Sequence, residues 1–149
     1  MSSPAYHLRA VQPEDYRFLW SLKCQTMRPY VEKTWGRWDD AEQEAYFRRE
    51  FKPQALQIIV ASSGDAGLLE VVREPAKIYL ARIEIRAELQ GQGLGSAVIR
   101  TLQTESRNAG IPLHLQVLKV NTLAQSLYVR LGFQVTGDTA THRLMRYAP

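Results

Sequence analysis

Apolar and polar residues alternate with a period of two in several short stretches of the chain, and this pattern predicts β-strands. Residues 83–86 read Ile-Glu-Ile-Arg, so the isoleucines share one face of a strand and the charged residues share the other. Runs that are rich in β-branched residues and bounded by turn residues predict further strands. The expected strands cover residues 6–11, 56–62, 68–74, 77–89, 112–118, 133–137 and 142–148, the last two forming a hairpin.

A period near 3.6 residues predicts helices between these strands. One begins at Leu94, ends at Gly110 and is barred from continuing by Pro112. Asp40 and Gln43 have the spacing of a capping box at the start of another. The expected helices cover residues 13–27, 39–51, 94–109 and 121–132, whereas residues 27–40 predict an irregular connection rich in aromatic residues.

The order of these elements predicts a mixed α/β sheet with helices on its faces. Within residues 77–89, however, the apolar positions change parity: Ile78 and Leu80 occupy one set of alternate positions, and Ile83 and Ile85 occupy the other. Either a bulge near residues 81–82 resets the register, or the strand is buried on both faces at its start.

The length of 149 residues and the hydrophobic content of 45% fit a single soluble domain over residues 1–149. No apolar run reaches the roughly 20 residues of a membrane span, and residues 1–11 lack the pattern of a secretory signal. The chain has one cysteine, Cys24, which favours a reducing compartment, so we expect a cytoplasmic location. The three histidines are widely separated, so no metal site is expected.

The net charge of +4 is concentrated in the second half of the chain. Residues 76–149 hold nine Lys and Arg against four Asp and Glu, whereas residues 1–75 hold ten against eleven. The basic residues form no cluster or stripe of the kind that binds nucleic acid, so no nucleic-acid partner is expected. A small anionic ligand fits this distribution better.

Three glycines lie within five residues in the segment 90–96, which reads QGQGLGS between a predicted strand and a predicted helix. Gly91, Gly93 and Gly95 let backbone amides converge and let a ligand approach closely. Together with the free N–H groups of a helix start, this indicates a phosphate site; the alternative is a plain turn that needs glycine geometry. The spacing fits neither a Walker loop nor a GxGxxG dinucleotide fingerprint.

A second pattern follows about 30 residues later, where residues 121–133 contain Asn121, Ala124, Tyr128, Gly132 and Phe133 at the spacing N..A...Y...GF. This pattern and the loop Gln-Gly-Gln-Gly-Leu-Gly at residues 90–95 resemble two motifs of the GNAT superfamily of acetyl-CoA-dependent N-acetyltransferases. The resemblance covers the order of elements along nearly the whole chain. It implies a mixed, mostly antiparallel, splayed sheet of about seven strands flanked by about four helices, with a bulge before the glycine loop.

The resemblance also implies acetyl-CoA as co-substrate and a primary amine, of a small molecule or a protein N-terminus, as acceptor. The loop amides would bind the pyrophosphate, and the strand backbone would pair with the pantetheine. Substitution is expected to be tolerated at Gln92 but not at Gly93 or Gly95. The residues expected to bind the co-substrate are Ile83, Ile85, Gln90, Gly91, Gln92, Gly93, Leu94, Gly95, Ser96, Asn121 and Tyr128. Asn121 would fix the ligand, cap its helix, or do both.

Two residues are candidates for proton transfer. Tyr128 holds the family position for donating a proton to the CoA thiolate, and its alternative role is that of a core aromatic residue. Glu84 is the candidate general base, acting directly or through water, and its alternative is an exposed strand residue paired with a neighbouring arginine. A backbone N–H near residues 83–85 would stabilise the oxyanion.

The acceptor pocket is expected in residues 27–40, with Tyr30, Glu32, Trp35 and Trp38 as candidate substrate-binding residues; alternatively these aromatic residues are core. Two other functions stay open: a non-catalytic acyl-CoA-binding module on the same fold, and a phosphate- or nucleotide-binding interaction domain. Edge strands near the C-terminus are compatible with a homodimer.

Overall fold

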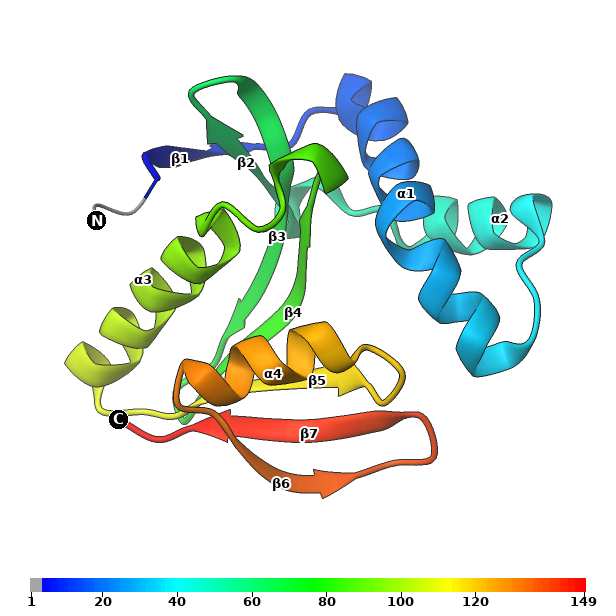
Figure 1. The fold of residues 1–149 in the computed structure, drawn as a ribbon. Coiled ribbons are helices and arrows are strands. Elements are labelled where there is room, and N and C mark those ends of the chain that lie inside the picture. Colours follow the sequence, from blue (N-terminus) through cyan, green and yellow to red (C-terminus); the bar gives the residue numbers. More distant parts are fainter. Residues whose placement is uncertain (1–3) are drawn as a thin grey trace.

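The computed structural model describes residues 4–149, in which seven strands form one sheet with four α-helices packed on its faces (Figure 1). The strand order is β1-β2-β3-β4-β5-β7-β6, and all neighbours are antiparallel except β4 and β5. The strands are β1 (Tyr6–Ala10), β2 (Gln57–Ala61), β3 (Gly64–Arg73), β4 (Ile78–Ile85), β5 (Leu113–Leu118), β6 (Gln134–Asp138) and β7 (His142–Tyr147). The helices are α1 (Tyr16–Trp35), α2 (Asp40–Glu50), α3 (Leu94–Ala109) and α4 (Thr122–Arg130). The predicted fold class is confirmed.

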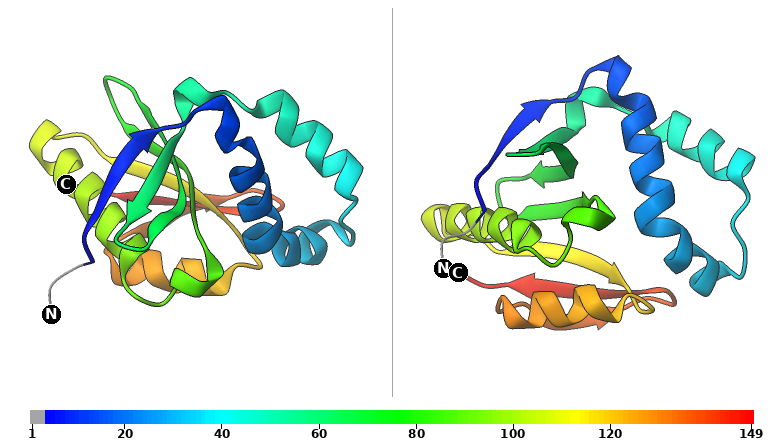
Figure 2. Two further views of the ribbon diagram at one scale, coloured as in Figure 1. Left: turned by 90° about the horizontal axis from the view of Figure 1, so that it is seen from above. Right: turned by 45° about the horizontal axis from the view of Figure 1, so that its top comes forward.

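The two faces of the sheet carry separate cores because successive strand residues point to opposite sides. Ile58 of β2 belongs to a buried cluster with Leu19 of α1 and Phe47 of α2. The adjacent Ile59 belongs to the larger cluster, which includes Val98 of α3 and Tyr128 of α4. Helices α1 and α2 therefore cover one face of the sheet, and α3 and α4 cover the other (Figure 2).

The two parallel strands part in the middle of the sheet. β4 pairs with β5 over three residues only, the last pair being Leu80 with Leu115. Beyond that pair the strands diverge, and β4 runs upward away from β5 (Figure 1). The second half of β4 thus loses its neighbour on one edge while β3 still pairs with the other.

The expected bulge lies in β4 just where the two strands part. Glu70 of β3 is opposite Arg82, but the next residue, Val71, is opposite Leu80, so Ala81 is the additional residue. This extra residue changes the parity of the strand and turns the side chains of its second half relative to the first. The prediction of a bulge at residues 81–82 is confirmed.

The prediction of an irregular connection over residues 27–40 is wrong for most of that segment. Helix α1 continues through Pro29 to Trp35 and ends at Gly36, whose φ is 85°. Proline in a helix removes one backbone hydrogen bond, yet the helix continues, and Val31 in the following turn is buried. Only four residues, Gly36 to Asp39, connect α1 to α2.

The cap of α2 also differs from the expected one by one residue. The N-cap is Asp39, whose Oδ1 accepts a hydrogen bond of 2.9 Å from the backbone N–H of Glu42. Asp40, the expected cap, instead accepts a hydrogen bond of 2.6 Å from the indole Nε1 of Trp38. Two adjacent aspartates made the identity of the N-cap ambiguous in the sequence. In the structure Asp39 caps the helix, and Asp40 is hydrogen-bonded to Trp38.

Candidate active site

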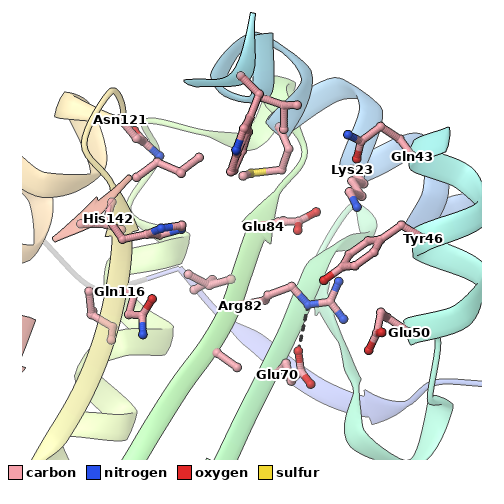
Figure 3. A pocket seen from close by; sticks show the side chains of 18 of the residues that line it. Lys23, Gln43, Tyr46, Glu50, Glu70, Arg82, Glu84, Gln116, Asn121 and His142 are labelled. Carbon is pink, nitrogen blue, oxygen red and sulfur yellow. Dashed lines mark hydrogen bonds and ion pairs between the residues drawn. The ribbon is translucent and has the colours of Figure 1, made fainter. Parts of the chain in front are cut away.

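A cleft of about 1210 Å³ opens on the face covered by α1 and α2, where β4 and β5 diverge (Figure 3). Helices α1 and α2 form one wall, β4 forms the floor, and β5, the start of α4 and β7 form the other wall. The parting of the strands therefore creates the cavity in the middle of the sheet.

The glycine loop lies at the upper end of β4, after the 3₁₀ turn η3 (Ala87–Leu89), and leads into α3. Gly91 and Gly93 have φ of 77° and 85°, a left-handed conformation that favours glycine. Among the described residues, the backbone N–H groups from Gly91 to Ser96 donate no hydrogen bond; the first amide of the helix to do so is that of Ala97, to Gly93 at 2.9 Å. Six consecutive free amides near the positive end of a helix dipole are suited to bind an anion.

The two glutamines of the loop are used differently from its glycines. The Gln90 side chain donates a hydrogen bond of 2.9 Å from Nε2 to the carbonyl oxygen of Ile85, which joins the loop to the end of β4. The Gln92 side chain donates a longer one of 3.3 Å to the Glu88 carbonyl oxygen. Both side chains point back to the preceding turn, so the loop presents its backbone outward.

The free edge of β4 presents backbone groups to the gap. The N–H of Arg86 donates 2.8 Å to the carbonyl oxygen of Ala66 in β3. Since hydrogen-bonded pairs alternate along an antiparallel ladder, the backbone of Glu84 also faces β3, and that of Ile83 and Ile85 faces away from it. β5 no longer pairs there, so Ile83 has no partner strand on this side within residues 4–149.

Glu84 lies on the floor of the cleft and is only 7% exposed. Its side chain faces α1, where the Oγ1 of Thr26 is 3.4 Å from Glu84 Oε1. Burial raises the pKa of the Glu84 carboxyl above its usual value, against the opposing effects of Arg82, Lys23 and Thr26. The alternative of an exposed strand residue paired with an arginine is wrong, because Glu84 is buried, Arg82 pairs with Glu70 at 2.8 Å and Arg86 pairs with Glu88 at 2.6 Å.

Tyr128 lies on α4 and lines the opposite side of the same cleft. Burial raises the pKa of its phenol to about 12, so the hydroxyl keeps its proton at neutral pH. The ring packs on Phe133 with 5.7 Å between ring centroids, yet the hydroxyl makes no hydrogen bond within the described residues. Tyr128 is thus a buried aromatic residue whose hydroxyl has no hydrogen-bond partner among the described residues.

Asn121 caps α4, since its Oδ1 accepts a hydrogen bond of 3.1 Å from the N–H of Ala124. The residue also lines the cleft, so both expected uses are compatible with its position.

The four expected acceptor-binding residues are not brought together. Trp35, at the end of α1, lines the cleft and is 57% exposed. Trp38 is buried and stacks on Trp20 with 6.1 Å between ring centroids, so it belongs to the core. Tyr30 and Glu32 do not line the cleft, because the helix that replaces the expected loop turns them away from it.

The wall of the cleft contains polar residues that the sequence analysis did not select. Lys23 of α1 and Gln43 and Tyr46 of α2 point into it, and His142 of β7 faces them from the opposite side (Figure 3). They belong to elements far apart in sequence and match no motif. The helical spacing of Lys23, Met27 and Val31 was the one available signal that Lys23 faces inward.

Within residues 4–149 no group of three or more His, Cys, Asp or Glu side chains could hold a metal ion. In the same residues, no helix combines the length and apolar character needed to span a membrane.

A splayed mixed sheet, a loop of free amides at a helix start and a cleft at the parting of two parallel strands occur together in one class of transferases. Residues 16–133 match the acetyltransferase (GNAT) family. The chain belongs to this family.

Comparisons with individual proteins agree with this assignment. N-acetyltransferase 8 of Rattus norvegicus is 28% identical over 134 residues, which cover 82% of this chain and 57% of that protein. The chain thus spans little more than half the length of this curated relative.

Solved structures show the same fold. The PaiA N-acetyltransferase of Thermoplasma acidophilum, in complex with coenzyme A, superposes with a TM-score of 0.74 over 97% of this chain and 99% of its own, at 17% identity. Naa50 of Arabidopsis thaliana, in complex with a bisubstrate analogue, superposes with a TM-score of 0.67 over 97% of this chain and 99% of its own, at 14% identity.

Proposed function

We propose that this protein transfers the acetyl group of acetyl-CoA to a primary amine by direct attack within a ternary complex. The observation that carries this proposal is the continuity of two features: the free amides at residues 91–96 lie beside the unpaired edge of β4, and that edge leads into the cleft that contains Glu84 and Tyr128. A long ligand with a phosphate at one end and amides along its arm matches this arrangement.

Each part of acetyl-CoA has a counterpart in this arrangement. The pyrophosphate would accept hydrogen bonds from the amides at the start of α3. The pantetheine arm would add to β4 like one more strand and pair with the backbone of Ile83 and with the N–H of Ile85. The thioester would then lie in the cleft near Glu84 and Tyr128. The Thermoplasma relative, which shares the fold, was solved in complex with coenzyme A, and this supports coenzyme A as the ligand.

The chemistry requires a neutral amine, a stabilised oxyanion and a protonated leaving group. Glu84 would take a proton from the acceptor ammonium, directly or through water, and its raised pKa suits that role. The amine nitrogen would then form a bond to the thioester carbon as a β4 backbone N–H holds the oxyanion. As the carbon–sulfur bond breaks, Tyr128 would give its proton to the thiolate, and the second proton of the amine would leave to solvent.

The finer assignments belong to the same proposal. In this proposal the acceptor is a primary amine of a small molecule or of a protein N-terminus. The protein would act in the cytoplasm, without a metal and without a nucleic-acid or membrane partner. Residues 1–149 would form one domain, which is compatible with a homodimer.

Calorimetry with acetyl-CoA, free CoA and ATP tests the donor. We expect acetyl-CoA and CoA to bind and ATP, which lacks the pantetheine arm, to bind far more weakly. Absence of CoA binding at millimolar concentration would refute the proposal, and equal binding of ATP would favour a nucleotide-binding domain.

Release of free thiol over a panel of amines tests catalysis. Binding of acetyl-CoA without any thiol release would identify an acyl-CoA-binding module instead of an enzyme. Glu84→Gln and Tyr128→Phe should both slow turnover, and full rates in both variants would show that these two roles are wrongly assigned.

A further inference from the structure

Lys23 is a cation of the cleft that forms no ion pair among the described residues, although the charge of Glu84 is near enough to act on it. Lys23 is half-buried on α1, and its Nζ makes no hydrogen bond or ion pair with any described residue. The ammonium lies instead 5.1 Å from the centroid of the Tyr46 ring and 5.6 Å from that of Phe47. Aromatic faces stabilise a cation but accept none of its three N–H donors as a carboxylate would.

Several other charges of the cleft are matched with one another, whereas Arg49 and Glu50 of α2 line it without an ion pair among the described residues. Arg82 pairs with Glu70 at 2.8 Å, and Arg37 pairs with Glu42 at 2.6 Å. The carboxylate of Asp39 caps α2. These contacts engage five of the charged residues that line the cleft.

The polar side chains next to Lys23 are also unsatisfied. The Gln43 carboxamide and the Tyr46 hydroxyl make no hydrogen bond within residues 4–149, and both point into the cleft beside the lysine (Figure 3). An ammonium, a carboxamide and a phenol together offer more hydrogen-bond donors than acceptors, the acceptors being the amide oxygen and the phenol oxygen, and such a set of donors can bind a carboxylate.

This group of donors lies close to the candidate base. Thr26 Oγ1 is 3.4 Å from Glu84 Oε1, and Lys23 precedes Thr26 by three residues, so the two side chains are neighbours on one face of α1. A ligand that places an amine at Glu84 and extends toward α1 therefore meets Lys23 within a few bonds.

Resting on the proposed function, we infer that the acceptor is an amine that also carries a carboxylate, an amino acid, with its amine at Glu84 and its carboxylate bound by Lys23, Gln43 and Tyr46. Lys23 is a specificity residue in this arrangement and takes no part in proton transfer. Glu84 alone would serve any amine, whereas Lys23 repels a second ammonium and disfavours a polyamine.

The test compares amino acids with the amines produced by their decarboxylation, phenylalanine with phenethylamine and ornithine with putrescine among them. Thiol release from acetyl-CoA gives kcat and KM for each. We expect the amino acid of at least one pair to exceed its amine by about tenfold or more in kcat/KM, since a charged hydrogen-bonded contact is worth about that much. Equal or higher values for the amines in every pair would overturn the inference.

Three variants separate recognition from structure. Lys23→Met keeps the apolar stem and should raise KM for the amino acid about tenfold with little change in kcat or in KM for the amine. Lys23→Arg should retain the preference. Lys33→Met, the same change at an exposed position of the same helix, should leave it unaltered. An equal loss with both members of a pair in Lys23→Met would show a structural role and overturn the inference.

A binding measurement keeps the inference testable if no amine is turned over. Calorimetry in the presence of CoA would then compare N-acetylphenylalanine with N-acetylphenethylamine. Tighter binding of the carboxylate compound, lost in Lys23→Met, supports the anion subsite even if the proposed catalysis fails. No difference between the two compounds overturns it.

Discussion

Replacing Gly95 by alanine should stabilise the protein and at the same time weaken its binding of acetyl-CoA. Gly95 is the second residue of α3 and does not have a positive φ. A Cβ built there would lie 3.9 Å from Cγ1 of Ile85, an ordinary contact that requires no movement. The folded protein therefore has room for the methyl group.

The magnitudes follow from these contacts. Alanine in place of glycine within a helix is worth roughly 0.5–1 kcal/mol, which for a domain of this size raises the unfolding midpoint by roughly 1–4 °C. The same methyl group would stand among the free amides where we propose that phosphate oxygens approach. Displacing them should raise the Kd of acetyl-CoA about tenfold or more, or about 1.4 kcal/mol.

Thermal unfolding without ligand and calorimetric titration with acetyl-CoA measure the two effects separately. Gln92→Ala is the control, because only the backbone of Gln92 is proposed to meet the ligand. Gly93→Ala is the contrasting change: its φ of 85° costs an alanine roughly 1–2 kcal/mol, so stability and binding should fall together. An unchanged Kd in Gly95→Ala would show that Gly95 does not face the pyrophosphate.

Other variants test the remaining roles. In Glu84→Gln, kcat should fall about 10²–10⁴-fold in a thiol-release assay, whereas undiminished turnover would exclude this base. The pKa of Glu84 is raised in the folded protein, so the stability that its protonated form contributes is fully present below the ordinary pKa and is lost as the pH rises through the raised pKa. Glu84→Gln should therefore unfold at a higher temperature than the wild type at pH 7. The kcat/KM of the wild type should fall as the pH is lowered through the same raised pKa. Tyr128→Phe should lose activity yet keep its unfolding midpoint, because the hydroxyl bonds to no described residue; a clearly lowered midpoint would indicate a structural hydroxyl. Asp39→Ala should cost about 1 kcal/mol by uncapping α2, and urea unfolding that shows no loss would contradict the cap.

Local patterns predicted most of the strands and both ends of α3. The change of parity between Leu80 and Ile83 left two alternatives, a bulge or a strand buried on both faces; the resemblance to the GNAT superfamily favoured the bulge, and the structure has it. The turn at the glycine loop could also be predicted from the sequence, because the left-handed conformation of Gly91 and Gly93 favours glycine at both positions.

Tertiary contacts decided what the sequence did not predict. Residues 27–40 were predicted to be an irregular connection, but α1 continues past Pro29 to Trp35, with Val31 buried in the turn that follows the proline. Trp38 was equally suitable for a pocket or a core, and only its stacking on Trp20 assigns it. Lys23 became a candidate only once α2 and β4 had been placed around it, since no spacing along the chain relates it to Glu84.

The width of the gap between β4 and β5 limits what can enter the gap. At Leu80 and Leu115 the two strands are paired, with the usual spacing of about 4.8 Å between neighbouring strands of a sheet. A further strand between them would require about twice that spacing. An exposed strand edge usually invites another polypeptide, with the risk of aggregation. Here the gap between β4 and β5 closes where Leu80 pairs with Leu115, so a further strand could follow the edge of β4 only as far as that pair. The opening is therefore a short edge that ends inside the sheet, and the slender arm of the proposed donor, which carries amides, is of a kind that could pair with it.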